Sequence, residues 1–158
     1  MALDDLATFD DFIRHWAEAR PDTIALREGD QVRTYGDLEA MSARICGGLA
    51  ALGLVKGDRV AYLGKNSELY FTLFYAAARM GVVMVPVGWR LAPPEWAYII
   101  NDTQAQILFL GDGFDAAGEA LGDMIPGVRH RMTADQTRRW MADSARGDFA
   151  PAGRDDAV

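Results

Sequence analysis

The sequence is poor in cysteine and has no long hydrophobic run. Cys46 is the only cysteine in 158 residues, which excludes a disulfide within the chain and a metal site built from several cysteines. A reducing compartment is the simplest expectation, so we predict a cytoplasmic location. No apolar stretch reaches the roughly 18 residues of a membrane span, and the first residues are acidic where a signal peptide would be basic.

An excess of positive charge is also missing. Sixteen Lys and Arg residues against 23 Asp and Glu residues give a net charge of -7. This balance excludes nucleic-acid or anionic-membrane binding that depends on bulk positive charge, although it leaves room for a local basic pocket. Half of the residues are hydrophobic and a quarter are charged, which is typical of a globular domain.

Helical and strand patterns alternate along the chain. Apolar residues at helical spacing predict an amphipathic helix over about 9–19, and the turn Gly29-Asp30 predicts a hairpin within 23–34. A long helix is expected over 36–52, where Gly53 follows as a terminating glycine.

The rest of the chain predicts a parallel sheet. The expected order is a strand at 59–63, a helix at 67–80 that is apolar on most sides, a strand at 82–87, a helix at 93–101, a strand at 107–110, a weaker helix at about 114–122, a short strand at 128–132 and a helix begun by the capping box Thr133-x-x-Gln136. The apolar run at 82–87 is typical of a strand buried on both faces. We therefore predict an α/β fold with a doubly wound, mainly parallel sheet and helices on both faces, plus the N-terminal helix and hairpin. Residues 1–146 are expected to form this α/β unit, and 147–158 are expected to be a solvated loop.

Two loops follow strands, where doubly wound sheets bind their ligands. Gly64-Lys65-Asn66-Ser67 superficially resembles a phosphate loop, but Asn66 separates Lys65 from Ser67 and Arg59 stands where the leading glycine belongs. We interpret Asn66 or Ser67 as the cap of the following helix.

The second loop, Gly88-Trp89-Arg90, is the stronger candidate for a ligand site. Trp89 offers a flat aromatic face, and the Arg90 guanidinium can bind a phosphate through parallel hydrogen bonds. The alternative is that Arg90 only pairs with an acidic neighbour such as Glu95. The sequence shows no metal-ligand spacing, catalytic triad or carboxylate pair, and Cys46 is interpreted as a packing residue. The aromatic residues of the helix at 67–80 are interpreted as core first; they are Tyr70, Phe71, Phe74 and Tyr75.

Several short segments occur in a characteristic order. They are Thr34-Tyr35-x-x-Leu38, Leu52-Gly53, Lys56-Gly57-Asp58-Arg59-Val60-Ala61, Asn66-Ser67, Gly81, Val85-Pro86, Arg90-Leu91, Glu95 and Tyr98. No single segment is specific, but their order and spacing over Phe9 to Leu110 resemble the beginning of the adenylate-forming (AMP-binding) enzymes. This superfamily includes acyl-CoA synthetases, luciferases and nonribosomal peptide adenylation domains.

The resemblance implies an ATP-dependent acyl-CoA synthetase. With ATP and Mg2+, such an enzyme converts a carboxylic acid to an acyl-adenylate and then transfers the acyl group to coenzyme A. The family's phosphate loop and its adenine-binding, ribose-binding and catalytic-lysine motifs do not occur before Val158. The resemblance therefore implies the first part of the large N-terminal domain, inactive alone and expected to bind no cofactor or metal by itself. Its implied partners are the remainder of the same polypeptide and a fatty or aryl acid, and a homo-oligomer is a further candidate.

The resemblance also gives the second loop a role. By position, Gly88-Trp89-Arg90 matches a family loop that often reads Asn-x-Arg and lies near coenzyme A. Gly88 departs from that asparagine, but Arg90 is present and becomes a candidate contact for a coenzyme A phosphate, with Trp89 as a weaker candidate. A different class of function stays open, namely an autonomous, non-enzymatic α/β interaction module.

Overall fold

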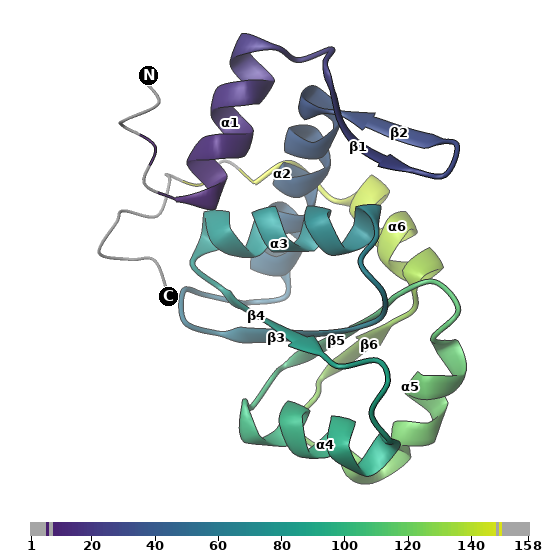
Figure 1. Ribbon diagram of the computed structural model, residues 1–158. Helices are drawn as coiled ribbons and strands as arrows, with labels where there is room; N and C mark the ends of the chain where they lie inside the picture. The colour runs from purple at the N-terminus through teal and green to yellow at the C-terminus, as the bar shows by residue number, and fades with distance from the viewer. Residues whose placement is uncertain (1–5, 7, 148, 150–158) are drawn as a thin grey trace.

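The computed structural model describes residues 6, 8–147 and 149, and a four-stranded parallel sheet forms its centre (Figure 1). The strands are β3 (Arg59–Leu63), β4 (Val83–Val87), β5 (Ile107–Leu110) and β6 (His130–Met132). Their order across the sheet is β4-β3-β5-β6, and every neighbouring pair is parallel. In the register of the sheet, Ala61 lies between Val85 and Leu108. The predicted parallel α/β sheet is confirmed.

Helices cover both faces of this sheet, as predicted. They are α1 (Phe9–Ala19), α2 (Tyr35–Ala51), α3 (Glu68–Met80), α4 (Pro93–Asp102), α5 (Asp115–Leu121), the short 3-10 helix η2 (Gly122–Met124) and α6 (Ala134–Asp143). Figure 1 shows α2, α3 and α6 on one face and α4 and α5 on the other, while α1 packs farther out against α2 and α3. The predicted hairpin is also present, as β1 (Ile24–Glu28) paired antiparallel with β2 (Gln31–Thr34).

The two faces of the sheet carry separate hydrophobic cores. Successive residues of a strand point to opposite faces, so Ile107 and Phe109 join the core beneath α2 and α3, whereas Leu108 and Leu110 join the core beneath α4 and α5. All four side chains of β5 are buried. A central strand buried on both faces needs apolar residues throughout, which explains the continuous apolar sequence of β5.

Short polar side chains fix where the helices begin. Thr34, Ser67 and Thr133 each accept a hydrogen bond from the backbone N–H three residues onward, at 3.1 to 3.2 Å. Such caps satisfy N–H groups that have no partner within the helix. The predicted capping box at Thr133 is complete, because the Gln136 side chain accepts from the Thr133 backbone N–H. Most predicted boundaries lie within one or two residues of the observed ones.

The prediction that 82–87 is buried on both faces was wrong. The strand begins at Val83 and lies at the edge of the four-stranded sheet; its first three residues are half-buried, and Pro86 is exposed. Proline has no N–H to donate, which an edge strand tolerates on its unpaired side. A continuous apolar sequence therefore indicates a strand, but it does not reveal whether a neighbour covers it.

The loop expected over 147–158 lies outside the described residues except for Gly147 and Phe149. Gly147 donates from its backbone N–H to the carbonyl of Ala43 at 2.8 Å, which holds the end of the described chain against α2. Within the described part of the chain, no helix is both long and apolar enough to cross a membrane.

Candidate functional site

The carboxyl ends of β3, β4 and β5 bring three loops together. Gly64 begins the loop after β3, Gly88 the loop after β4 and Gly111 the loop after β5. A Cβ atom at Gly64 would lie 2.8 Å from the Cα of Gly111, and one at Gly111 would lie 2.6 Å from the Oη of Tyr62. Real Cβ atoms do not approach other atoms so closely, so the two glycines permit the contact between the first and third loops.

The Tyr62 hydroxyl forms hydrogen bonds with the loop after β3. It lies 2.9 Å from the carbonyl oxygen of Lys65, to which it donates, and 3.1 Å from Oγ of Ser67. Burial raises the pKa of the Tyr62 hydroxyl, so the group is neutral and able to donate at physiological pH. Ser67 in turn caps α3, which confirms the interpretation of Asn66 or Ser67 as the start of this helix. The hydroxyl of Tyr62 was not singled out from the sequence, where its one signal is a tyrosine between the aliphatic residues Ala61 and Leu63.

The loop after β4 presents Trp89 with two cations beside its ring. Cζ of Arg90 lies 4.2 Å from the ring centroid, and Nζ of Lys65 lies 5.1 Å from it. The ring of Phe114, from the third loop, packs edge-on against Trp89 with centroids 6.3 Å apart. The structure therefore brings together the two residues proposed from the sequence, Trp89 and Arg90, and adds Lys65 and Phe114 from the neighbouring loops.

Hydrogen bonds fix the backbone that carries Trp89. The indole N–H of Trp96 on α4 donates to the carbonyl of Gly88 at 3.0 Å, and the same carbonyl accepts from the Leu91 backbone N–H at 3.0 Å. The alternative partner for Arg90 is occupied elsewhere, because the Glu95 carboxylate accepts from the Ala92 N–H at 2.8 Å at the start of α4. Within residues 8–147, no ion pair joins Arg90 to Glu95. The Arg90 side chain is exposed.

The other residues considered from the sequence do not lie in the three loops at the carboxyl ends of the strands. Cys46 is fully buried in α2, where its thiol donates to the Ala76 carbonyl at 3.4 Å, and burial raises its pKa to about 12. A thiol of this kind is protonated and unreactive, and its complete burial confirms the interpretation of Cys46 as a packing residue. Among residues 8–147, no cluster of three or more His, Cys, Asp or Glu residues is arranged to hold a metal ion.

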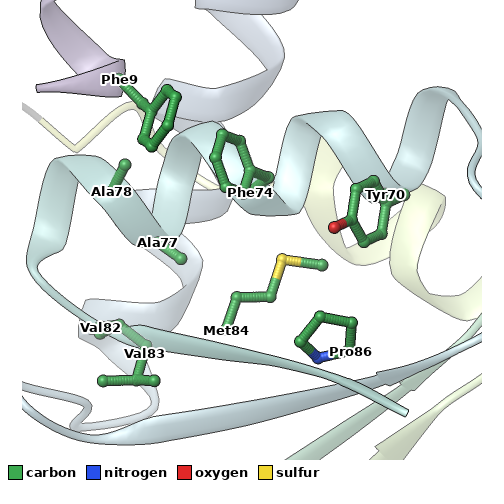
Figure 2. Close-up of a pocket in the computed structure, with 9 residues that line it drawn as sticks. All are labelled: Phe9, Tyr70, Phe74, Ala77, Ala78, Val82, Val83, Met84 and Pro86. Atoms are coloured by element: carbon green, nitrogen blue, oxygen red, sulfur yellow. The ribbon is translucent and has the colours of Figure 1, made fainter. Parts of the chain in front are cut away.

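The aromatic residues of α3 are less buried than the sequence suggested. Tyr70, Phe71, Phe74 and Tyr75 are all half-buried rather than core. Figure 2 shows Tyr70 and Phe74 lining an apolar groove that runs between α3 and β4, with Phe9 of α1 at one end and Pro86 at the other. The ring of Phe9 packs edge-on against Phe74 with centroids 4.9 Å apart, yet 61% of Phe9 stays exposed. The groove follows β4 at the side of the sheet, and Pro86 at its end lies three residues before Trp89 in the chain.

Comparison with known sequences finds one family over most of the chain. The family described as AMP-binding enzyme matches residues 13–153. The fatty acid–[acyl-carrier-protein] ligase ScoC of Streptomyces coeruleorubidus is 43% identical over 105 residues, which cover 66% of this chain and 20% of ScoC. The long-chain-fatty-acid–CoA ligase FadD13 of Mycobacterium tuberculosis is 44% identical over 78 residues, covering 49% of this chain and 16% of that protein.

Solved structures give the same result. The N-terminal domain of FACL13 from Mycobacterium tuberculosis superposes with a TM-score of 0.85 and 30% identity, covering 94% of this chain and 39% of that one. The anthranilate CoA ligase AuaEII shares the fold, with a TM-score of 0.87 at 23% identity over 99% of this chain and 32% of that one. The chain spans 20% of the length of ScoC and 16% of FadD13. With the family matched from residue 13 to residue 153, the chain belongs to the AMP-binding enzymes.

Proposed function

We propose that this chain is the first α/β subdomain of an ATP-dependent acid–thiol ligase that forms an acyl-adenylate and passes the acyl group to coenzyme A. In this proposal residues 1–146 are the subdomain, and 147–158 lead toward the rest of the polypeptide. The observation that carries it is the superposition of nearly the whole chain on the N-terminal domain of FACL13. The names of ScoC and FadD13, both ligases of fatty acids, support the reaction class.

The residues that the structure describes do not fit ATP and Mg2+. The one Gly-Lys loop is closed by its own hydrogen bonds, because Ser67 caps α3 and the Lys65 carbonyl is bound by Tyr62. A triphosphate site needs converging backbone N–H groups and a lysine, with carboxylates that hold the metal ion. No metal-holding cluster occurs among the described residues. We therefore assign the adenylation chemistry to other parts of the ligase and derive no step of it here.

The loops at the carboxyl ends of the strands do fit the phosphate groups of coenzyme A. Arg90 is exposed, has no carboxylate partner among the described residues, and is mounted on a loop that Trp96 and Leu91 hold in place. A guanidinium fixed in this way can bind a phosphate bidentately. In the proposed reaction Arg90 binds a coenzyme A phosphate, Trp89 holds the guanidinium in position, and neither residue takes part in bond making.

The apolar groove between α3 and β4 suggests where the remainder of the polypeptide packs. The groove exposes aromatic side chains beside an unpaired strand edge, and both features favour association. We propose that the same polypeptide covers it in the complete ligase and that the isolated chain self-associates through it. Sedimentation of the isolated chain tests this, since a compact monomer that binds no apolar dye would contradict the proposal.

A two-part assay distinguishes the proposed ligase from the alternative, a non-enzymatic interaction module. The complete polypeptide carrying this segment should release pyrophosphate from ATP only when a carboxylic acid is present, and should form a thioester only when coenzyme A is added. Fatty acids are the first class to assay, with an aryl acid beside them because a feruloyl-CoA synthase is also a relative. The 158-residue chain alone should show no micromolar binding of Mg-ATP by calorimetry. A complete polypeptide that releases no acid-dependent pyrophosphate with either class would contradict the ligase proposal. The cytoplasmic location expected from the sequence stays a prediction.

A further inference from the structure

Lys65 and Arg90 come from different strand ends but share one aromatic ring. Both cationic groups lie within 5.1 Å of the Trp89 centroid, so no more than about twice that distance separates them. The face of an indole ring attracts cations, and an aromatic contact of this kind holds a long side chain in place. Two like charges therefore lie close together at one ring.

Nothing described nearby neutralises this pair. Within residues 8–147, neither Lys65 nor Arg90 has a carboxylate at ion-pair distance. The loop after β5 carries Asp112, which is bound bidentately by Arg138 at 2.8 and 2.7 Å. The Arg138 contact holds the pKa of the Asp112 carboxyl below its usual value, so this carboxylate is charged but already paired. The two exposed cations therefore leave local positive charge at the sheet edge of a chain whose net charge is -7.

We propose that Lys65 is a second phosphate-binding residue, which acts with Arg90 through their shared contact with Trp89 to hold the bisphosphorylated nucleotide end of the thiol substrate. This inference rests on the proposed function. It adds a residue that the family resemblance did not supply, and it distinguishes between thiol substrates. Coenzyme A carries a 3′-phosphate and a 5′-diphosphate on one nucleoside, whereas the phosphopantetheine arm of a carrier protein carries one phosphodiester. Two cations at this spacing favour the ligand with two phosphate positions.

Hydrogen bonds hold the backbone that carries each of the two cations. The backbone of Lys65 is anchored where its carbonyl accepts from Tyr62, and the loop of Arg90 is anchored where Gly88 accepts from Trp96. Phe114 packs edge-on against Trp89 and limits its motion. β3 and β4 pair in parallel, with Leu63 opposite Val87, so the two loops begin side by side at the same end of the sheet.

The inference is tested on the isolated chain by NMR, with the indole N–H of Trp89 as the reporter. A Trp89→Phe variant assigns that resonance. Adenosine 3′,5′-bisphosphate, AMP and adenosine are titrated separately at low ionic strength, because exposed charges are screened by salt. We expect the bisphosphate to shift the Trp89 signal with a dissociation constant in the millimolar range, a weak affinity that revises the expectation that the isolated chain binds no cofactor. AMP should bind about fivefold more weakly, and adenosine should cause no comparable shift.

Matched variants decide whether Lys65 takes part. Lys65→Ala and Arg90→Ala should each weaken bisphosphate binding by about fivefold, to the level of AMP. Lys56→Ala removes the chain's other lysine, which lies in the turn before β3 at the opposite end of that strand, and should change binding by less than about twofold. Arg20→Ala removes an arginine that also lies over a tryptophan, Trp16 at 5.3 Å, but has no second cation at its ring among the described residues, and it should be equally silent.

Three results would overturn the inference. One is unchanged bisphosphate binding in Lys65→Ala while Arg90→Ala is weakened, which would leave a one-cation site. The second is equal binding of AMP and the bisphosphate, and the third is a loss of equal size in Lys56→Ala. Since this test measures binding to the chain and not turnover, a complete polypeptide that forms thioesters would uphold the proposed function even where the two-cation inference fails.

Discussion

The Nε atom of Arg79 on α3 donates to Oδ1 of Asp10 on α1 at 2.7 Å, and both side chains are almost completely buried. Glu39 on α2 accepts from Nη1 of the same guanidinium at 3.1 Å, so one arginine joins three helices. The Nη2 atom of Arg79 is buried without a hydrogen-bond partner. The guanidinium is therefore paired, but one of its N–H groups lacks a hydrogen-bond acceptor. The stability of the fold depends strongly on the two carboxylates that offset the buried charge.

Asp10→Ala is expected to lower the free energy of unfolding by about 3–5 kcal/mol, because it leaves a buried guanidinium without its closest counter-ion. Urea denaturation measures the loss. Asp22→Ala, at an exposed aspartate just after α1, is the matched control and should change stability by no more than about 0.5 kcal/mol. Replacing both partners, as in Asp10→Leu with Arg79→Met, should recover most of the loss. Equal stability of Asp10→Ala and Asp22→Ala would show that the pair is not a stabilising contact.

Glu39 is expected to make stability depend on acid pH. Burial alone would raise the pKa of its carboxyl, but hydrogen bonds and charge from Arg146 and Arg79 outweigh burial and hold that pKa below its ordinary value of 4.5. A carboxyl whose pKa is lower in the folded state stabilises the fold above the unfolded pKa, and this contribution is lost as the pH falls through the folded pKa. The free energy of unfolding should therefore decrease below about pH 4.5, with up to about 1 kcal/mol of the decrease due to Glu39.

The contribution of Glu39 is isolated by difference, because Asp112 also has a lowered pKa and acts in the same direction. Glu39→Gln should give a flatter pH profile than the unchanged chain between about pH 5 and about pH 3, a range that brackets the ordinary glutamate pKa of 4.5. Glu119→Gln, at an exposed glutamate of α5, should leave the profile as it was. Parallel profiles for Glu39→Gln and the unchanged chain would contradict the assignment.

Gly111→Ala is expected to destabilise the chain by about 1–3 kcal/mol, since the added methyl group would lie 2.6 Å from the Tyr62 hydroxyl and 3.0 Å from the Cα of Gly64. Thermal unfolding compares it with Gly127→Ala, where nothing lies within 4 Å and the expected change is neutral or slightly stabilising. In a Tyr62→Phe background the same Gly111→Ala change should cost less, because the hydroxyl that it meets is gone. If Gly111→Ala and Gly127→Ala were equally stable, the close approach of the two loops would be wrong.

Most of the fold was predictable because its determinants are local. Apolar periodicity gave the helices, continuous apolar runs gave β3 and β5, and short polar caps such as Thr133 gave the helix starts. The position of β4 within the sheet could not be predicted from its local sequence. Val83 to Val87 has the composition of a central strand, and only the order of the strands places it at the edge.

The site was predictable only in part. Trp89 and Arg90 are adjacent in sequence and could be proposed together, but the approach of Lys65 to Trp89 depends on the parallel pairing of β3 with β4. The contact of Arg79 with Asp10 is hidden for the same reason, since it requires knowing how α1 packs on α3. Glu95 was a reasonable partner for Arg90 by spacing, yet its carboxylate is used at the start of α4. Long-range pairing of this kind follows from tertiary structure rather than from residue types.

The most direct test of the proposed role of the loop after β4 is an assay of Arg90→Ala in the complete ligase that measures the two reaction steps separately. Acid-dependent pyrophosphate release reports adenylate formation, and thioester formation reports the second step; Arg20→Ala serves as the control. A phosphate contact acts only when coenzyme A binds, and one charge-assisted hydrogen bond contributes about 1.5–3 kcal/mol. We therefore predict that thioester formation at subsaturating coenzyme A falls by about tenfold or more, while pyrophosphate release changes by less than about twofold. An equal loss in both steps, or no loss in either, would contradict the account.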